Sequence, residues 1–170
     1  NLPVYEGHGR LESATTVRVN GEVLESERIV LNVGGRAVVP DMPGIEDVDY
    51  LTNSNIMEVD FLPEHLVVVG GSYIGLEFAQ MYRRFGSQVT VVQRGPMLIE
   101  REDEDVKTAV QEIIEGEGID VRLGAECIAV KKRGDGVAIT STCETGPEEV
   151  VGSHVLLAVG RQPNTDDLGI

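Results

Sequence analysis

The chain has 170 residues, 41% of them hydrophobic, which is enough for one ordinary domain or for a small domain with pieces of another. Aromatic residues make up only 4%, so we expect a core of Val, Ile, Leu and Ala, which suits a parallel sheet buried on both faces. The formal net charge is -15, from 29 acidic and 14 basic residues, and this charge disfavours nucleic-acid binding.

The first third of the chain predicts short strands joined by turns. The pair Asn20-Gly21 after the segment Thr16–Val19 favours a β-hairpin with a primed turn. The β-branched run Ile29–Val33 predicts another strand. The proline-containing segment 38–51 predicts an extended connector, because proline fixes φ and lacks an N–H group.

Beyond Pro63 the pattern alternates between strands and helices, as in a doubly wound βαβαβ half. We expect strands over Leu66–Val69, Val89–Val92 and Asp120–Leu123, and helices from the turn after the first strand to Gly86 and over Asp103–Glu117. Apolar residues at helical spacing predict the buried face of the first helix: Ile74, Phe78, Met81, Tyr82 and Phe85.

The remainder predicts an antiparallel three-stranded meander, with turns at Gly134-Asp135-Gly136 and near Gly146-Pro147, and then a last apolar strand over Val155–Val159. The meander strands are expected over Cys127–Lys132, Val137–Thr142 and Glu149–Val151. The fold class is therefore predicted to be α/β, a Rossmann-like βαβαβ parallel sheet with a three-stranded antiparallel meander.

The turn after the first buried strand is glycine-rich and matches the dinucleotide-binding pattern at all but one position. Its sequence is Gly70-Gly71-Ser72-Tyr73-Ile74-Gly75. Gly70 permits the tight turn, the small Ser72 stands where a second glycine is usual, and Gly75 allows close helix–strand packing. The first N–H groups of the helix would then face a pyrophosphate. The alternative is a glycine turn in an α/β protein that binds no nucleotide.

Residues after the second strand bear on the choice of nicotinamide cofactor. An acid there would bind both ribose hydroxyls of NAD, but this chain has the neutral Gln93 followed by Arg94. A guanidinium pairs with a 2′-phosphate, and Arg101 is a second candidate for that role. We therefore predict NADP(H) in preference to NAD(H). The alternative for Arg94 is a solvated turn residue that balances nearby acids.

The segment "HLVVVGGSYIGLEFAQMYRRFGSQVTVV" resembles the NAD(P)H domain of the class I pyridine nucleotide-disulfide oxidoreductases, flavoproteins that include dihydrolipoamide dehydrogenase, glutathione reductase and mercuric reductase. The segment "RGPMLIEREDEDV" is similar to the mercuric-reductase branch. "NVGGRAVVPDMPG" and "LLAVGRQPNTDDLGI" resemble the flavin-domain strands on either side. The resemblance implies FAD in the full-length protein, hydride transfer from NAD(P)H to FAD, and a redox-active disulfide.

The resemblance also assigns residues. Tyr73 matches a tyrosine that covers the flavin until nicotinamide displaces it, and Glu77 matches a glutamate that pairs with a lysine beside the flavin. Gly160 and Arg161 begin the motif at which the chain re-enters the flavin domain. From the residues alone, Tyr73 is equally open to ordinary helix packing, and Glu77 to a favourable interaction with the helix dipole.

Parts of the family pattern are absent from this sequence: the flavin-phosphate glycine motif, the close cysteine pair and the dimerisation domain. We therefore expect a partial FAD-domain segment and connector over 1–62, the NAD(P)H-binding domain over 63–152 and a return to the FAD domain over 153–170. The termini interrupt these motifs, which predicts a piece of a longer, homodimeric enzyme that is inactive as this chain alone.

A stand-alone module that senses NADP(H) without catalysis is the alternative function. A short-chain dehydrogenase is disfavoured, because no Tyr has a Lys four residues further on, and the meander disfavours a methyltransferase. No metal site is expected, since the three histidines are isolated. Cys127 and Cys143 are expected to be reduced thiols of a cytoplasmic protein. No apolar run approaches the ~18 residues of a membrane span.

Overall fold

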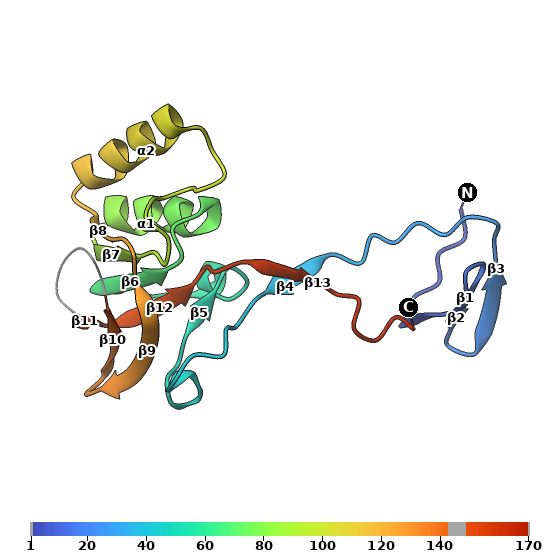
Figure 1. Cartoon of the computed structure of the whole chain (residues 1–170). Helices are drawn as coiled ribbons and strands as arrows, with labels where there is room; N and C mark the ends of the chain where they lie inside the picture. The colour runs from blue at the N-terminus through green and yellow to red at the C-terminus, as the bar shows by residue number, and fades with distance from the viewer. Residues whose placement is uncertain (1, 143–148, 170) are drawn as a thin grey trace. The chain divides into compact units, whose positions relative to one another are not determined.

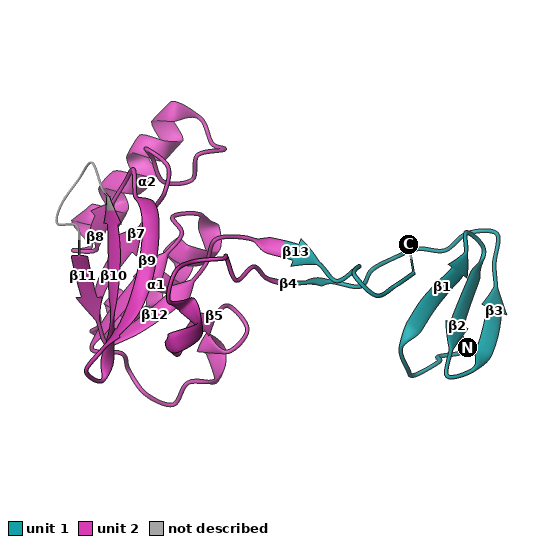
Figure 2. Cartoon of the chain, turned by 60° about the horizontal axis from the view of Figure 1, so that its bottom comes forward, with its two compact units in different colours: residues 1–36, 162–170 teal, residues 37–161 magenta. Residues whose placement is uncertain are grey.

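The computed structural model describes residues 2–142 and 149–169 (Figure 1). The chain divides into two compact units, a smaller one made of residues 1–36 and 162–170 and a larger one made of residues 37–161 (Figure 2). The β4 strand (Gly35–Ala37) and the β13 strand (Arg161–Pro163) form a two-stranded sheet at the points where the chain passes from one unit to the other.

An antiparallel sheet of three strands, in the order β1-β2-β3, forms most of the smaller unit. Its strands are β1 (Gly9–Ser13), β2 (Thr16–Val19) and β3 (Glu22–Glu25). Between the last two strands, Asn20 has φ 49° and Gly21 has φ 91°. A type I′ turn requires positive φ at both central residues, so the predicted hairpin is confirmed.

The strand predicted over Ile29–Val33 is wrong. These residues are in no strand of the structure, and Val30 is 89% exposed. The end of the segment is held by Asn164, whose side-chain amide donates to the Val33 carbonyl at 3.1 Å. A β-branched run becomes a strand only where a neighbouring strand and a face to pack against are available. The described part of the smaller unit supplies neither to this segment.

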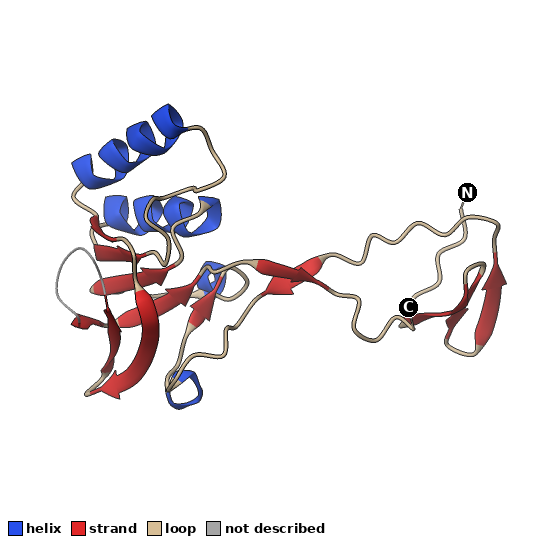
Figure 3. Cartoon of the chain, viewed as in Figure 1, coloured by secondary structure: helices blue, strands red, loops and turns tan. Residues whose placement is uncertain are grey.

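The larger unit contains a five-stranded parallel sheet in the order β5-β12-β6-β7-β8. Its strands are β5 (Leu51–Thr52), β6 (His65–Val69), β7 (Gln88–Val92), β8 (Asp120–Arg122) and β12 (His154–Leu157). The helices α1 (Tyr73–Phe85) and α2 (Glu104–Gly116) cover one face (Figure 3). Short 3-10 helices at Ile45–Asp47 and Ile56–Glu58 lie in the connector. The predicted fold class is confirmed.

The meander covers the other face of this sheet. It consists of β9 (Glu126–Arg133), β10 (Gly136–Thr142) and β11 (Glu149–Gly152), paired antiparallel as predicted. The turn expected near Gly146-Pro147 lies outside the described residues. Alternate residues of β6 enter two different cores, with Leu66 and Val68 on the helix side and Val67 and Val69 on the meander side. Burial on both faces explains why this strand is a continuous apolar run.

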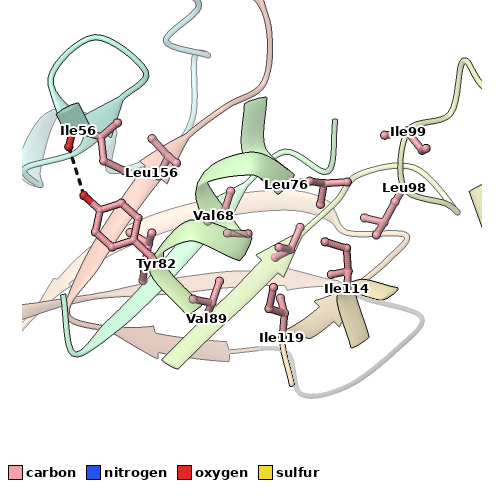
Figure 4. Close-up of a cluster of buried hydrophobic side chains, with 13 residues drawn as sticks. Ile56, Val68, Leu76, Tyr82, Val89, Leu98, Ile99, Ile114, Ile119 and Leu156 are labelled. Carbon is pink, nitrogen blue, oxygen red and sulfur yellow. Dashed lines mark hydrogen bonds between the residues drawn. The ribbon is translucent and has the colours of Figure 1, made fainter. Parts of the chain in front are cut away.

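The α1 helix packs through a face that matches the predicted one in part, since Tyr82 is buried and Phe78 and Met81 pack against the core. Gly75, Leu76, Ala79 and Tyr82 are buried, whereas Phe85 is 62% exposed. Figure 4 shows the Tyr82 hydroxyl donating to the Ile56 carbonyl, at 3.2 Å. The glycine sets the rotation of the helix, because the face without a side chain approaches the sheet most closely. Counting large apolar residues alone therefore included the exposed Phe85 and left out the small buried residues Gly75 and Ala79.

The compact units divide at 36/37 and 161/162. The domain boundaries expected from the sequence, at 62/63 and 152/153, stay a prediction. The β12 strand lies between β5 and β6 in the parallel sheet. The strand expected to return the chain to a flavin domain thus belongs to the same sheet as the glycine-rich turn.

His65 opens the central strand and makes the stability of the larger unit sensitive to pH. Its Nε2 lies 2.9 Å from the Thr90 hydroxyl, and partial burial lowers the pKa of the imidazole below its ordinary value. The unfolded chain then binds the proton more readily than the folded chain. Stability is therefore fully present above the ordinary histidine pKa, about 6.5, and declines as the pH falls below it.

We predict that the melting temperature falls between about pH 7.5 and about pH 5.5, and that His65→Gln lessens this fall. Thermal melts followed by circular dichroism across that range provide the measurement. His8→Gln, at an exposed position of the smaller unit, is the matched control. An unchanged pH dependence in His65→Gln would show that His65 does not contribute to it.

Candidate functional site

The glycine-rich turn lies at the carboxyl end of β6, in the centre of the parallel sheet. Gly70 has φ 116° and donates its N–H to the Val92 carbonyl at 2.9 Å. An added Cβ at this position would collide with the carbonyl of Ala158, which follows β12. The position therefore excludes any side chain, both by its backbone conformation and by its surroundings.

Gly75 brings the first turn of α1 against the strand that precedes it. An added Cβ would collide with the Gly70 carbonyl oxygen and would lie 3.3 Å from Cγ1 of Val68. The start of the helix is therefore held directly over the end of β6. Any larger residue would have to move the helix away from the sheet.

Three backbone N–H groups at the start of α1 are left for a ligand. The Ser72 carbonyl accepts the first helical bond, from the Leu76 N–H at 3.0 Å. Helix geometry leaves the N–H groups of Tyr73, Ile74 and Gly75 without intrahelical acceptors. Ser72 itself is exposed and extended, with φ -105° and ψ -176°. Free N–H groups at the positive end of a helix, beside residues without side chains, form an anion-binding arrangement.

Gln93, at the tip of β7, holds the glycine-rich turn. Its side-chain oxygen accepts from the Gly71 N–H at 2.8 Å, and its backbone N–H donates to the Arg122 carbonyl at 2.7 Å. Its backbone carbonyl accepts from the Ala125 N–H at 3.0 Å. Gln93 was predicted as a residue that faces the ribose. The structure shows that its amide oxygen is engaged by the turn.

The loop between β7 and α2, residues 93–103, is anchored beside the turn. Leu98 is fully buried and Ile99 is 5% exposed, and both belong to the core on the helix side of the sheet. The Ile99 N–H donates to the Gly71 carbonyl at 2.9 Å. Ile99 has φ 41°, which is unusual for a β-branched residue, so packing and this bond impose the conformation. The neighbouring side chains are thereby fixed next to the glycine-rich turn.

Tyr73 is the first residue of α1 and remains 51% exposed. Its hydroxyl donates to the Glu102 carboxylate, and this bond raises the pKa of the phenol above its ordinary value. The positive charge of Arg101 acts in the opposite direction on the same pKa. The site thus gathers an aromatic ring, a cation and an anion at the beginning of the helix.

The predicted site residues lie in different surroundings in the structure. Gln93 contacts the glycine-rich turn, whereas Arg94 and Arg101 are exposed on the loop and Glu77 is exposed further along α1. Gly160 has φ 140° and follows β12, and its carbonyl accepts from the Val38 N–H at 3.0 Å. Arg161 begins β13 and is exposed.

Sequence reasoning missed two acidic side chains at this site, Glu100 and Glu102. They belong to an acidic stretch in the sequence, residues 100–105, which by itself indicates only the favourable N-terminus of a helix. That role belongs to Asp103, the N-cap of α2, and to the acids that follow it. The signal for the other two was the apolar pair Leu98-Ile99 just before them, because burying that pair turns the loop back towards the glycine-rich turn.

Within residues 2–142 and 149–169, no group of three or more His, Cys, Asp or Glu residues is arranged to hold a metal ion. Cys127 is an exposed free thiol, and Cys143 lies outside the described residues. No helix in that part of the chain is long and apolar enough to cross a membrane.

A family model described as "Pyridine nucleotide-disulphide oxidoreductase" matches residues 2–170. The chain belongs to this family. Over 170 residues it is 31% identical to a mercuric reductase of Lysinibacillus sphaericus, a match that covers 100% of the chain and 31% of that protein. It is 34% identical to a glutathione reductase of Nostoc sp., covering 99% of the chain and 36% of that protein.

A solved structure of the HOCl-induced flavoprotein disulfide reductase RclA from Escherichia coli matches with a TM-score of 0.81 and 32% identity, covering 95% of this chain and 37% of that chain. The family resemblance seen in the sequence is therefore confirmed. The chain spans about a third of the length of the mercuric and glutathione reductases that it matches.

Proposed function

We propose that the larger unit is the NAD(P)H-binding domain of an FAD-dependent pyridine nucleotide-disulfide oxidoreductase. The observation that carries this proposal is the start of α1, where glycines bring free backbone N–H groups to the carboxyl end of the central parallel strand. In the full-length protein, the bound nucleotide supplies a hydride that passes to the flavin and then to a disulfide or a related acceptor.

The residues of this chain fit a dinucleotide pyrophosphate. The N–H groups of Tyr73, Ile74 and Gly75 bind its oxygens, and the small, exposed Ser72 permits their approach. Tyr73, exposed at the start of α1, is the proposed contact for the nicotinamide. For FAD, the described residues offer no second α-helix that a glycine-rich turn opens, since α2 begins after Asp103.

NADP(H) is the proposed cofactor in preference to NAD(H). The tip of β7 carries the neutral Gln93, and the loop that follows carries two exposed guanidinium groups, Arg94 and Arg101. In an otherwise acidic chain these are cations that can pair with a 2′-phosphate. The ribose of a dinucleotide bound at the glycine-rich turn lies near this tip.

Titrating the 170-residue chain with NADPH and with NADH by calorimetry tests both parts of the proposal. We expect NADPH to bind more tightly. At 100-fold excess over its dissociation constant, it should stabilise the protein by about 2.7 kcal/mol, visible as a higher melting temperature. Arg101→Ala should weaken NADPH binding by about tenfold, since one charge-assisted contact is lost.

Arg28→Ala, which removes an exposed arginine from the smaller unit, is the matched control and should leave NADPH binding unchanged. Tighter binding of NADH would retain the domain assignment and refute the cofactor preference. Binding of neither nucleotide would refute the proposed function.

A further inference from the structure

We propose that Glu100 is a specificity-determining residue, whose carboxylate disfavours a 2′-phosphate and so limits the preference for NADPH over NADH. The inference rests on the proposed function and concerns the same site. None of the residues predicted from the sequence carries a negative charge at the tip of β7. In the structure, Glu100 of the loop that follows β7 supplies this negative charge.

The Glu100 carboxylate lies in front of the backbone just beyond β7. An added Cβ at Gly95 would coincide with one of its oxygens, so the glycine leaves the space that the carboxylate fills. The Gln93 amide nitrogen donates to the same carboxylate at 3.4 Å. Glu100 therefore stands over the tip of the strand, next to the residue that holds the glycine-rich turn.

The buried residues that precede Glu100 in the loop fix its position. Leu98 and Ile99 are buried in the core, and the Ile99 N–H donates to the Gly71 carbonyl at 2.9 Å. The positive φ of Ile99 turns the backbone so that the next residue emerges over Gly95. Glu100 is the first exposed residue after this anchored pair. Its backbone is therefore tied to the same turn that would hold the pyrophosphate.

The charged side chains near the tip of β7 have opposite effects on a 2′-phosphate. A carboxylate at the end of the second strand accepts hydrogen bonds from ribose hydroxyls but repels a phosphate ester. Arg94 and Arg101 attract the same phosphate. Glu100 and the arginines thus act in opposite directions on one substituent of the cofactor, and removing the carboxylate shifts the balance towards NADPH.

The test compares the 170-residue chain, Glu100→Gln and Asp105→Asn by calorimetric titration with NADPH and NADH. We expect Glu100→Gln to raise the ratio of NADPH affinity to NADH affinity by about tenfold, since a like charge near the phosphate is removed. Asp105→Asn removes one charge from the exposed start of α2, where the carboxylate accepts from the adjacent Val106 N–H at 3.0 Å. It should leave the ratio unchanged.

An unchanged ratio in Glu100→Gln overturns this inference while leaving the proposed function intact, because both nucleotides still bind. An equal rise in Asp105→Asn also overturns it, since the effect would then come from the total charge of the chain. If the unmodified chain binds neither nucleotide, the proposed function fails and this inference fails with it.

Discussion

Replacing Gly75 with alanine is expected to lower the free energy of unfolding of the larger unit by about 2–3 kcal/mol, because the new methyl group collides with backbone rather than with a movable side chain. The Gly70 carbonyl oxygen occupies the position that an added Cβ would need. The collision is relieved only if α1 moves away from β6, which separates the apolar surfaces of Leu76 and Ala79 from the sheet. Chemical unfolding followed by circular dichroism measures the change.

Gly116→Ala is the matched control for this substitution. Gly116 is also helical, and an added Cβ there meets nothing within 4 Å. Alanine should therefore stabilise α2 by up to about 1 kcal/mol through its higher helix propensity. Because both variants make the same chemical change within a helix, the difference between them isolates the contact with Gly70. Equal stabilities would show that α1 has room at its first turn.

Gly75→Ala should also weaken nucleotide binding, provided that the proposed function holds. Moving the start of the helix displaces the N–H groups that would face the pyrophosphate. Calorimetry with NADPH on Gly75→Ala and Gly116→Ala separates the two effects, since only the first variant moves these groups. Full NADPH affinity in Gly75→Ala would contradict their assignment as pyrophosphate ligands.

Local chemistry made much of the larger unit predictable from its sequence. The apolar strand Leu66–Val69 is buried on both faces, and Gly86, with φ 113°, ends α1 where a glycine was expected to end it. The meander follows from alternating strands separated by glycine turns. In each case the residues that decide the structure are neighbours in the sequence.

The features that were missed depend on contacts between distant residues. The segment Ile29–Val33 has strand composition, but strand formation requires a partner that its own residues do not encode. The rotation of α1 depends on how closely Gly75 approaches the carbonyl of Gly70, which a count of apolar side chains ignores. The pairing of β5 and β12 joins segments about a hundred residues apart, and two-residue strands such as β5 leave little periodic signal.

The candidate site, too, could be predicted from the sequence only in part. The positions without side chains, Gly70 and Gly75, were identified because glycine has few other reasons to recur at that spacing. The acids Glu100 and Glu102 were missed because an acidic stretch before a helix has an ordinary explanation in the helix dipole. Only the burial of Leu98 and Ile99 shows that the loop turns back over the site.

Replacing Gln93 with leucine is expected to lower the free energy of unfolding by about 1–3 kcal/mol, because the buried Gly71 N–H loses its acceptor. That N–H donates to the Gln93 side-chain oxygen at 2.8 Å, and leucine has a similar size but no oxygen. Gln111→Leu is the matched control. Its amide donates to the exposed Glu115 carboxylate at 2.9 Å, so the loss of this surface bond should change stability by less than about 0.5 kcal/mol.

The variant Gln93→Glu separates the effect of losing the hydrogen-bond acceptor from the effect of adding a negative charge at residue 93. A carboxylate still accepts from the Gly71 N–H, so it should retain more stability than leucine does. It also places a negative charge beside Glu100, where the glutamine amide now donates at 3.4 Å. The combination of Gln93→Glu with Glu100→Gln restores a neutral donor opposite an acceptor, and should be more stable than Gln93→Glu alone. A double-mutant cycle measures this coupling, expected at about 1 kcal/mol for partly exposed side chains. Strict additivity of the two changes would mean that Gln93 and Glu100 do not interact, and that the loop holds the glycine-rich turn only through the bond from the Ile99 N–H to the Gly71 carbonyl.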